Sequence, residues 1–123
     1  MAEVAKTKEI KSRRKGAFSA PDPLVVASES YRVTFENDLI RVLDINLGKG
    51  KRSPMHSHPN YLGYAVTSCR VRFTYPDGKS EEVAFKAGDT VWREAETHQV
   101  DNVGDTDCHV LNIELKQQSK AAH

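Results

Sequence analysis

Three of the five histidines in this 123-residue sequence are spaced so that they could hold a metal ion. His56 and His58 lie two residues apart, so on a strand both imidazoles would project from one face. His98 follows 40 residues after His58, at the start of another apparent strand. The three histidines therefore predict a mononuclear site for one divalent metal ion, although an isolated His-x-His is also found as a pair of core or surface histidines.

Aromatic and apolar residues near these histidines are candidates for substrate contacts. The predicted substrate-binding residues are Tyr61, Leu62, Tyr64 and Trp92. By strand alternation some of them should face the interior, where a phenol or an indole can hydrogen-bond a ligand. The alternative is that the aromatic rings simply belong to the hydrophobic core.

Polar residues beside His98 could assist it. Gln99 and Asn102 could orient the imidazole, because a ligating histidine normally donates its second N–H to a polar partner. Glu94 and Glu96 could offer a carboxylate or a general base, but a solvated turn is the preferred interpretation of this segment. The sequence contains neither a nucleophile–base–acid series nor a glycine-rich phosphate loop.

The segments that must position these residues follow a period of two. Apolar and polar residues alternate over 31–35, 71–75 and 110–115, and 40–47 changes register midway, which indicates a bulge. Pro76-Asp-Gly78 is typical of a hairpin turn. No segment has a clear helical period, so the pattern predicts an all-β sandwich or barrel.

Length and composition place the chain among small soluble globular proteins. With 38% hydrophobic residues and a longest apolar run of Leu24 to Ala27, it has no segment that could form a membrane-spanning helix. No apolar segment of a secretory signal follows the basic N-terminus. Cys69 and Cys108 are too few for a disulfide framework, so we predict free, buried thiols and a cytoplasmic location.

The net charge of +1 divides unevenly along the chain. Residues 1–20 hold six basic and two acidic residues, whereas the remainder holds twelve basic and fifteen acidic ones. We predict a disordered basic N-terminal arm over 1–20, a folded domain over 21–116 and a frayed C-terminal tail over 117–123. The arm could dock on phosphates or anionic lipid, but a solvated tail is preferred, and we expect no nucleic-acid partner.

Over residues 24–115 the sequence resembles a small single-domain cupin. The first cupin motif is matched by Gly50, His56 and His58, and the second by Gly88, His98 and Asn102. The family's metal-binding glutamate is replaced by Leu62, or by Gly63 if the spacing is one residue longer. More loosely, the chain is similar to the subgroup that includes the β-alanine degradation protein.

The resemblance implies a double-stranded β-helix (jelly-roll) barrel, a homodimer and a three-histidine metal site. Such a site is similar to that of the thiol and diketone dioxygenases of the superfamily, with iron as the favoured metal and zinc, manganese, nickel or copper as alternatives. Without the carboxylate, a divalent ion would keep a charge near +2, which favours an anionic ligand. We therefore expect a dioxygenase acting on a small polar metabolite or, alternatively, a non-catalytic sensor or storage module that binds a small ligand.

Overall fold

The computed structural model describes residues 7–10 and 20–116, which form ten strands and one short helix. The elements are β1 (Thr7–Ile10), α1 (Pro23–Val26), β2 (Tyr31–Glu36), β3 (Ile40–Leu47), β4 (Arg52–His58), β5 (Tyr61–Ala65), β6 (Cys69–Thr74), β7 (Ser80–Phe85), β8 (Thr90–Arg93), β9 (Glu96–Asn102) and β10 (Cys108–Leu115). The predicted fold class is confirmed.

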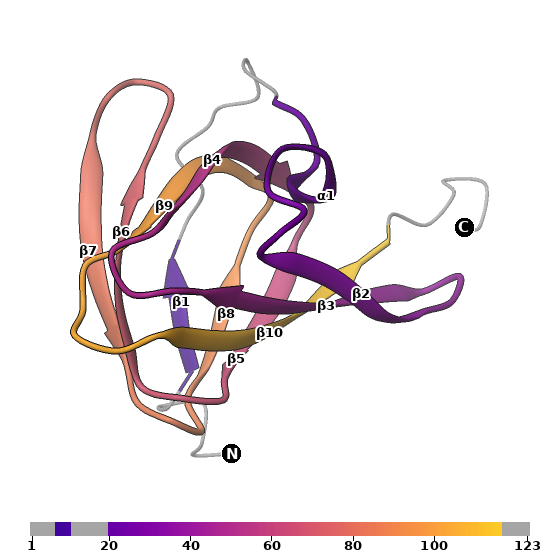
Figure 1. Ribbon diagram of the computed structural model, residues 1–123. Coiled ribbons are helices and arrows are strands. Elements are labelled where there is room, and N and C mark those ends of the chain that lie inside the picture. Colours follow the sequence, from indigo (N-terminus) through magenta and orange to yellow (C-terminus); the bar gives the residue numbers. More distant parts are fainter. Residues whose placement is uncertain (1–6, 11–19, 117–123) are drawn as a thin grey trace.

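Two sheets enclose the core of the barrel (Figure 1). The larger sheet has the strand order β1-β8-β5-β10-β3-β2, and the smaller has the order β4-β9-β6-β7. Between β3 and β10 the chain crosses repeatedly from one sheet to the other, as expected of a jelly roll. Consequently the inward faces of β4 and β9 lie opposite those of β5 and β10, and a side chain from any of them can reach the interior.

The apolar core includes a disulfide bond between the two sheets. Cys69 of β6 and Cys108 of β10 are bonded, with a Cα–Cα distance of 5.2 Å. The prediction of free thiols is therefore wrong. A residue count could not show that two cysteines 39 positions apart would lie on facing strands at the distance that a disulfide requires.

The bulge lies in a different strand from the one expected. The register shifts between Val33 and Phe35 of β2, so that the extra residue is in the partner of β3 rather than in β3 itself. The sequence of β3 gave a misleading signal because Ile40 and Val42 are apolar residues on the outward face, whereas Leu43 is fully buried.

Hydrogen bonds hold the segment that leads into the first strands of the domain. Asp22 caps α1 by accepting a hydrogen bond from the backbone N–H of Leu24. Ser57 of β4 binds this entry segment, because its hydroxyl accepts from the N–H of Ala20 and its own N–H donates to the carbonyl of Pro21. Of the predicted arm, the structure describes β1, which pairs in parallel with β8, and Ala20. The rest of the arm and the predicted tail lie outside the described residues.

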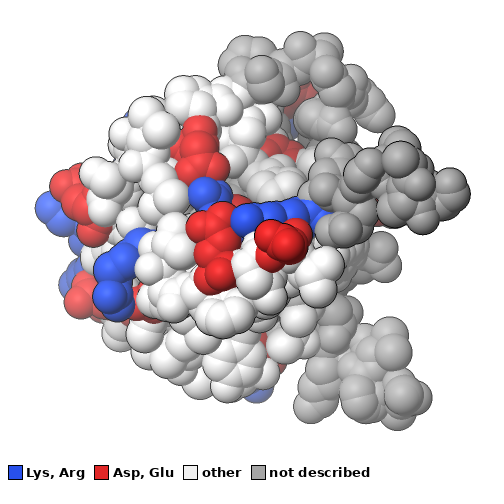
Figure 2. Space-filling view, turned by 90° about the vertical axis from the view of Figure 1, so that its right-hand side faces the viewer, with Lys and Arg blue, Asp and Glu red and all other residues white. Residues whose placement is uncertain are grey.

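The charged side chains of the domain are mixed in sign. Figure 2 shows acidic and basic groups lying next to each other on the face seen from the right of Figure 1. Among the described residues, Arg41 pairs with Asp22 at 2.8 Å and Lys116 with Glu36 at 2.7 Å. Within 7–10 and 20–116, none of the helices has the length and apolar character needed to cross a bilayer.

Candidate metal centre

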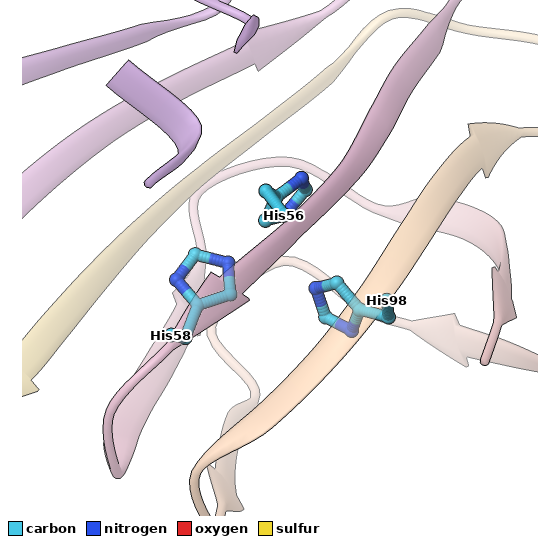
Figure 3. A group of neighbouring side chains, drawn as sticks. All are labelled: His56, His58 and His98. Carbon is cyan, nitrogen blue, oxygen red and sulfur yellow. The ribbon is translucent and has the colours of Figure 1, made fainter. Parts of the chain in front are cut away.

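The three predicted ligands converge inside the barrel. His56 and His98 are directly opposite each other on β4 and β9, and His58 follows on the same face of β4 (Figure 3). All three are buried, and one nitrogen from each lies within 4.8 Å of the others. A metal ion bound at about 2.0–2.1 Å needs nitrogens roughly 3–3.5 Å apart, so modest ring movements would complete the site.

His56 is oriented by its own strand. Its Nδ1 lies 2.6 Å from the carbonyl oxygen of Pro54, which can only accept, so this nitrogen carries the proton. Its Nε2 is therefore the nitrogen with the free lone pair. The hydroxyl of Tyr31 lies 3.4 Å from that Nε2 and is the donor in this contact.

His58 is oriented by a carboxylate from the facing sheet. Its Nδ1 donates to Glu114 Oε2 at 2.7 Å, and Glu114 Oε1 accepts from Arg41 of the neighbouring strand at 2.8–2.9 Å. A carboxylate that binds the distal nitrogen of a histidine fixes the ring and increases its basicity. The Nε2 of His58 is thereby left available to a metal ion.

His98 packs against Phe73, with the rings stacked at 4.8 Å, and lies beside a buried ion pair. Its Nδ1 is 3.3 Å from Glu96 Oε2 but is not aligned for a hydrogen bond, and it has no other partner in the part of the chain that the structure describes. Glu96 is bound through both oxygens by Arg93, and it also accepts from the hydroxyl of Tyr61 at 2.9 Å. With 2% of its surface exposed, Glu96 is not part of a solvated turn, so that interpretation is wrong for Glu96.

Burial keeps two of the imidazoles neutral. It lowers the pKa of His56 to about 2, with a further contribution from His58 and His98. Burial also lowers the pKa of His98 to about 4 against the opposing effect of Glu96. Burial raises the pKa of Glu96, but its interactions with the neighbouring His98 and with the Arg93 guanidinium outweigh that effect and hold the pKa below the usual range. Neutral imidazoles are the form that binds a metal ion, so the donor set fits one.

A cavity of about 70 Å³ opens beside these side chains. Its polar lining residues are Tyr31, His58, Tyr61, Arg93, His98 and Asn112. The remaining lining is apolar, from residues such as Leu47, Val71, Phe85, Val100 and Val110. The cavity therefore combines one cluster of ligating and hydrogen-bonding groups with a larger apolar surface.

Only one of the four predicted substrate-binding residues lines this cavity. Tyr61 is buried with its ring 4.8 Å from that of His58. Leu62 and Tyr64 alternate with the inward-facing residues of β5. Trp92 pairs with Leu62 and alternates with the inward-facing residues of β8. These three side chains therefore face away from the cavity, because strand alternation places them on the outer side of the large sheet.

The same alternation identifies the position that corresponds to the family's glutamate. Gly63 lines the cavity, whereas Leu62 faces outward. An added Cβ at Gly63 would lie 3.3 Å from the side-chain oxygen of Asn112, so this position has no room to spare. The glutamate is therefore replaced by glycine on the cavity wall.

Sequence reasoning placed Asn102 in the wrong role and missed several residues of the site. Asn102 donates to the carbonyls of Leu47 and Thr106 and does not contact His98; it holds a loop in place. The missed residues are Tyr31, Arg93, Asn112 and Glu114. The available signal was polar residues at inward positions of alternating strands, such as Asn112 and Glu114 on β10.

Comparison with known proteins identifies the family. The model of the Cupin domain matches residues 43–114, more than half of the chain, so this protein belongs to the cupin family. A comparison with curated proteins gives no match. Membership agrees with the jelly-roll fold and with the histidine cluster, and it leaves the subgroup open.

Solved structures support the same fold. A cupin domain from Bordetella pertussis Tohama I aligns with a TM-score of 0.66 and 22% identity, covering 82% of this chain and all of that one. An arginine-to-alanine mutant of Bacillus subtilis oxalate decarboxylase aligns with a TM-score of 0.51 and 23% identity over 67% of this chain and 23% of that one. The polyketide cyclase RemF from Streptomyces resistomycificus aligns at 0.56 and 18% identity, over 88% of this chain and 80% of that one.

Proposed function

We propose that His56, His58 and His98 bind one divalent metal ion, most favourably iron, and that the protein is a dioxygenase acting on a small polar metabolite. The convergence of three buried imidazoles carries this proposal. The distal nitrogens of His56 and His58 are already engaged, which leaves the other nitrogens of these two rings for the ion. A redox-active ion would supply the electron transfer that such a reaction requires.

The cavity suggests which substrates to test. A polar group of the substrate would lie beside His58, His98 and Tyr61, and its apolar part would contact residues such as Val71 and Val100. Small carboxylates with a short aliphatic or aromatic portion meet this description. The name of one structural neighbour, oxalate decarboxylase, also points to a small carboxylate as a ligand of this fold.

Elemental analysis of protein purified without added metal is the first test. We expect about one equivalent of metal in the wild-type protein and none in a His98→Ala variant. A His109→Ala variant is the matched control, because His109 lies on β10 bound to Asp44 and outside the cluster. Wild-type protein that holds no metal after purification and after incubation with iron or zinc would rule out the metal centre.

Turnover is the second test. Oxygen uptake with a panel of small carboxylates should require iron and should be lost in His98→Ala. Substrate turnover that survives complete metal removal would contradict the proposal. Metal binding without oxygen uptake on any substrate would instead support the second candidate.

The second candidate is a non-catalytic module that binds a small ligand as a sensor or store. One observation favours it: each of the two buried carboxylates beside the histidines already has an arginine partner. Among the described residues of the cavity, no carboxylate is therefore left as a general base. A ligand that copurifies tightly with the protein and is released unchanged would support this candidate.

The family resemblance also motivates a homodimer, related to the β-alanine degradation subgroup. The outer face of the large sheet offers a surface for dimerisation. An apolar row crosses it in register, formed by Phe35, Val42, Ile113, Leu62 and Trp92. Phe35 has 52% of its surface exposed, which suits a contact with a second copy.

A further inference from the structure

We propose that Tyr31 is a fourth protein ligand of the metal centre, supplied by β2 in place of the glutamate that the family carries on β5. The inference rests on the proposed binding of a metal ion to His56, His58 and His98. It concerns a residue that belongs to neither of the two histidine motifs.

The phenol of Tyr31 already points at the atom that a metal ion would bind. Tyr31 has 5% of its surface exposed, and its hydroxyl oxygen lies 3.4 Å from His56 Nε2. Since Pro54 takes the proton of His56 Nδ1, the Tyr31 hydroxyl donates to the lone pair on Nε2. Ser53 in turn donates to the Tyr31 oxygen at 3.3 Å, which fixes the phenol in this direction.

Metal binding at His56 would remove the acceptor of this hydrogen bond. A buried hydroxyl that loses its partner carries an energetic cost, and direct coordination gives the oxygen a new partner. Two ligand atoms about 2.0–2.1 Å from a tetrahedral ion are roughly 3.4 Å apart. The distance from Tyr31 Oη to His56 Nε2, 3.4 Å, already matches this spacing.

The charges around the site favour an additional anionic ligand. Glu96 is paired with Arg93 and Glu114 with Arg41, so neither carboxylate is free to balance a divalent ion on neutral imidazoles. Gly63 contributes no side chain at the family's carboxylate position. A Tyr31 phenolate supplies one negative charge: its O–H bond breaks, the proton passes to the buffer, and the oxygen binds the ion.

The test is a titration of metal-free protein with Zn²⁺ alone, followed by the ultraviolet difference band of ionised tyrosine. Zinc has no redox chemistry, and a bound water that ionises does not produce this band. We expect one tyrosinate per bound zinc in the wild-type protein. In Tyr31→Phe we expect the band to vanish and zinc to bind at least tenfold more weakly.

Variants at the other tyrosines are the controls. The sequence has four tyrosines, and Tyr61→Phe removes the other phenol that contacts a histidine of the cluster, whereas Tyr64→Phe removes an exposed one. Both should keep the full band. If Tyr31→Phe does not fold, retention of the band in these two variants and in Tyr75→Phe assigns it to Tyr31 by elimination.

The outcomes separate this inference from the proposed function. Stoichiometric zinc binding without a tyrosinate band would overturn the role of Tyr31 and leave the three-histidine centre intact. A band that persists in Tyr31→Phe would also overturn it. Failure of the wild-type protein to bind zinc or any other divalent metal would overturn both.

Discussion

Acidification should destabilise the metal-free protein well above the pH at which carboxylates titrate. In the folded protein His56 and His98 have pKa values of about 2 and about 4, against 6.5 for an unperturbed histidine. As the pH falls below 6.5, the unfolded chain therefore takes up protons that the folded one does not, and stability decreases. Between pH 7 and pH 5 each histidine contributes a loss of about 2 kcal/mol, at 1.36 kcal/mol per pKa unit, so together they contribute about 4 kcal/mol.

Urea unfolding in the presence of a chelator at pH 7, 6 and 5 measures this effect. His98→Gln should lose about half of the pH dependence, because one of the two buried histidines is gone. His123→Gln, at the end of the chain, should behave as the wild type does. A free energy of unfolding that changes by less than about 1 kcal/mol between pH 7 and 5 would refute the electrostatic account of the cluster.

Three further changes test other parts of the structure. Glu96→Gln leaves the buried guanidinium of Arg93 without its anionic partner and should lower the free energy of unfolding by about 3–5 kcal/mol. The control is Glu94→Gln, at a half-buried residue. If this control lowered the free energy of unfolding by as much, the result would argue against a specific Arg93–Glu96 ion pair. Alkylation of the unreduced, denatured protein should label neither cysteine, and reduction should cost about 2–5 kcal/mol of stability; two reactive thiols before reduction would show that the disulfide is absent. Phe35→Glu should convert a dimer to a monomer in light scattering while leaving the melting temperature nearly unchanged, and a variant that remains dimeric would exclude this face.

The elements that carry the site could be predicted because their signals are local. A period of two in the sequence corresponds directly to the two faces of a strand, and this was enough to recognise the all-β fold. His56 and His58 share a face for the same reason, and His98 joins them because it lies at the start of another apparent strand. The structure then places His56 opposite His98 in neighbouring strands.

The surroundings of the histidines were not predictable from the same pattern, because both faces of the large sheet depart from a simple division into apolar inside and polar outside. On β10 the inward residues Asn112 and Glu114 are polar, whereas the outward Ile113 is apolar. In β2 the bulge between Val33 and Phe35 turns Phe35 outward, although alternation alone groups it with buried Tyr31. Both departures depend on contacts between strands that are distant in the sequence.

The replacement of the family's glutamate shows what such contacts add. The sequence offers Leu62 and Gly63 as alternatives with opposite consequences, since a leucine in the cavity would fill it and a glycine opens it. The structure turns Leu62 outward and leaves Gly63 on the wall. Among the residues that the structure describes, a metal ion there would have neither a carboxylate ligand nor an unpaired anion nearby, because arginines bind Glu96 and Glu114. The compensating charge must then come from a bound anion or from Tyr31, and the zinc titration distinguishes these two sources.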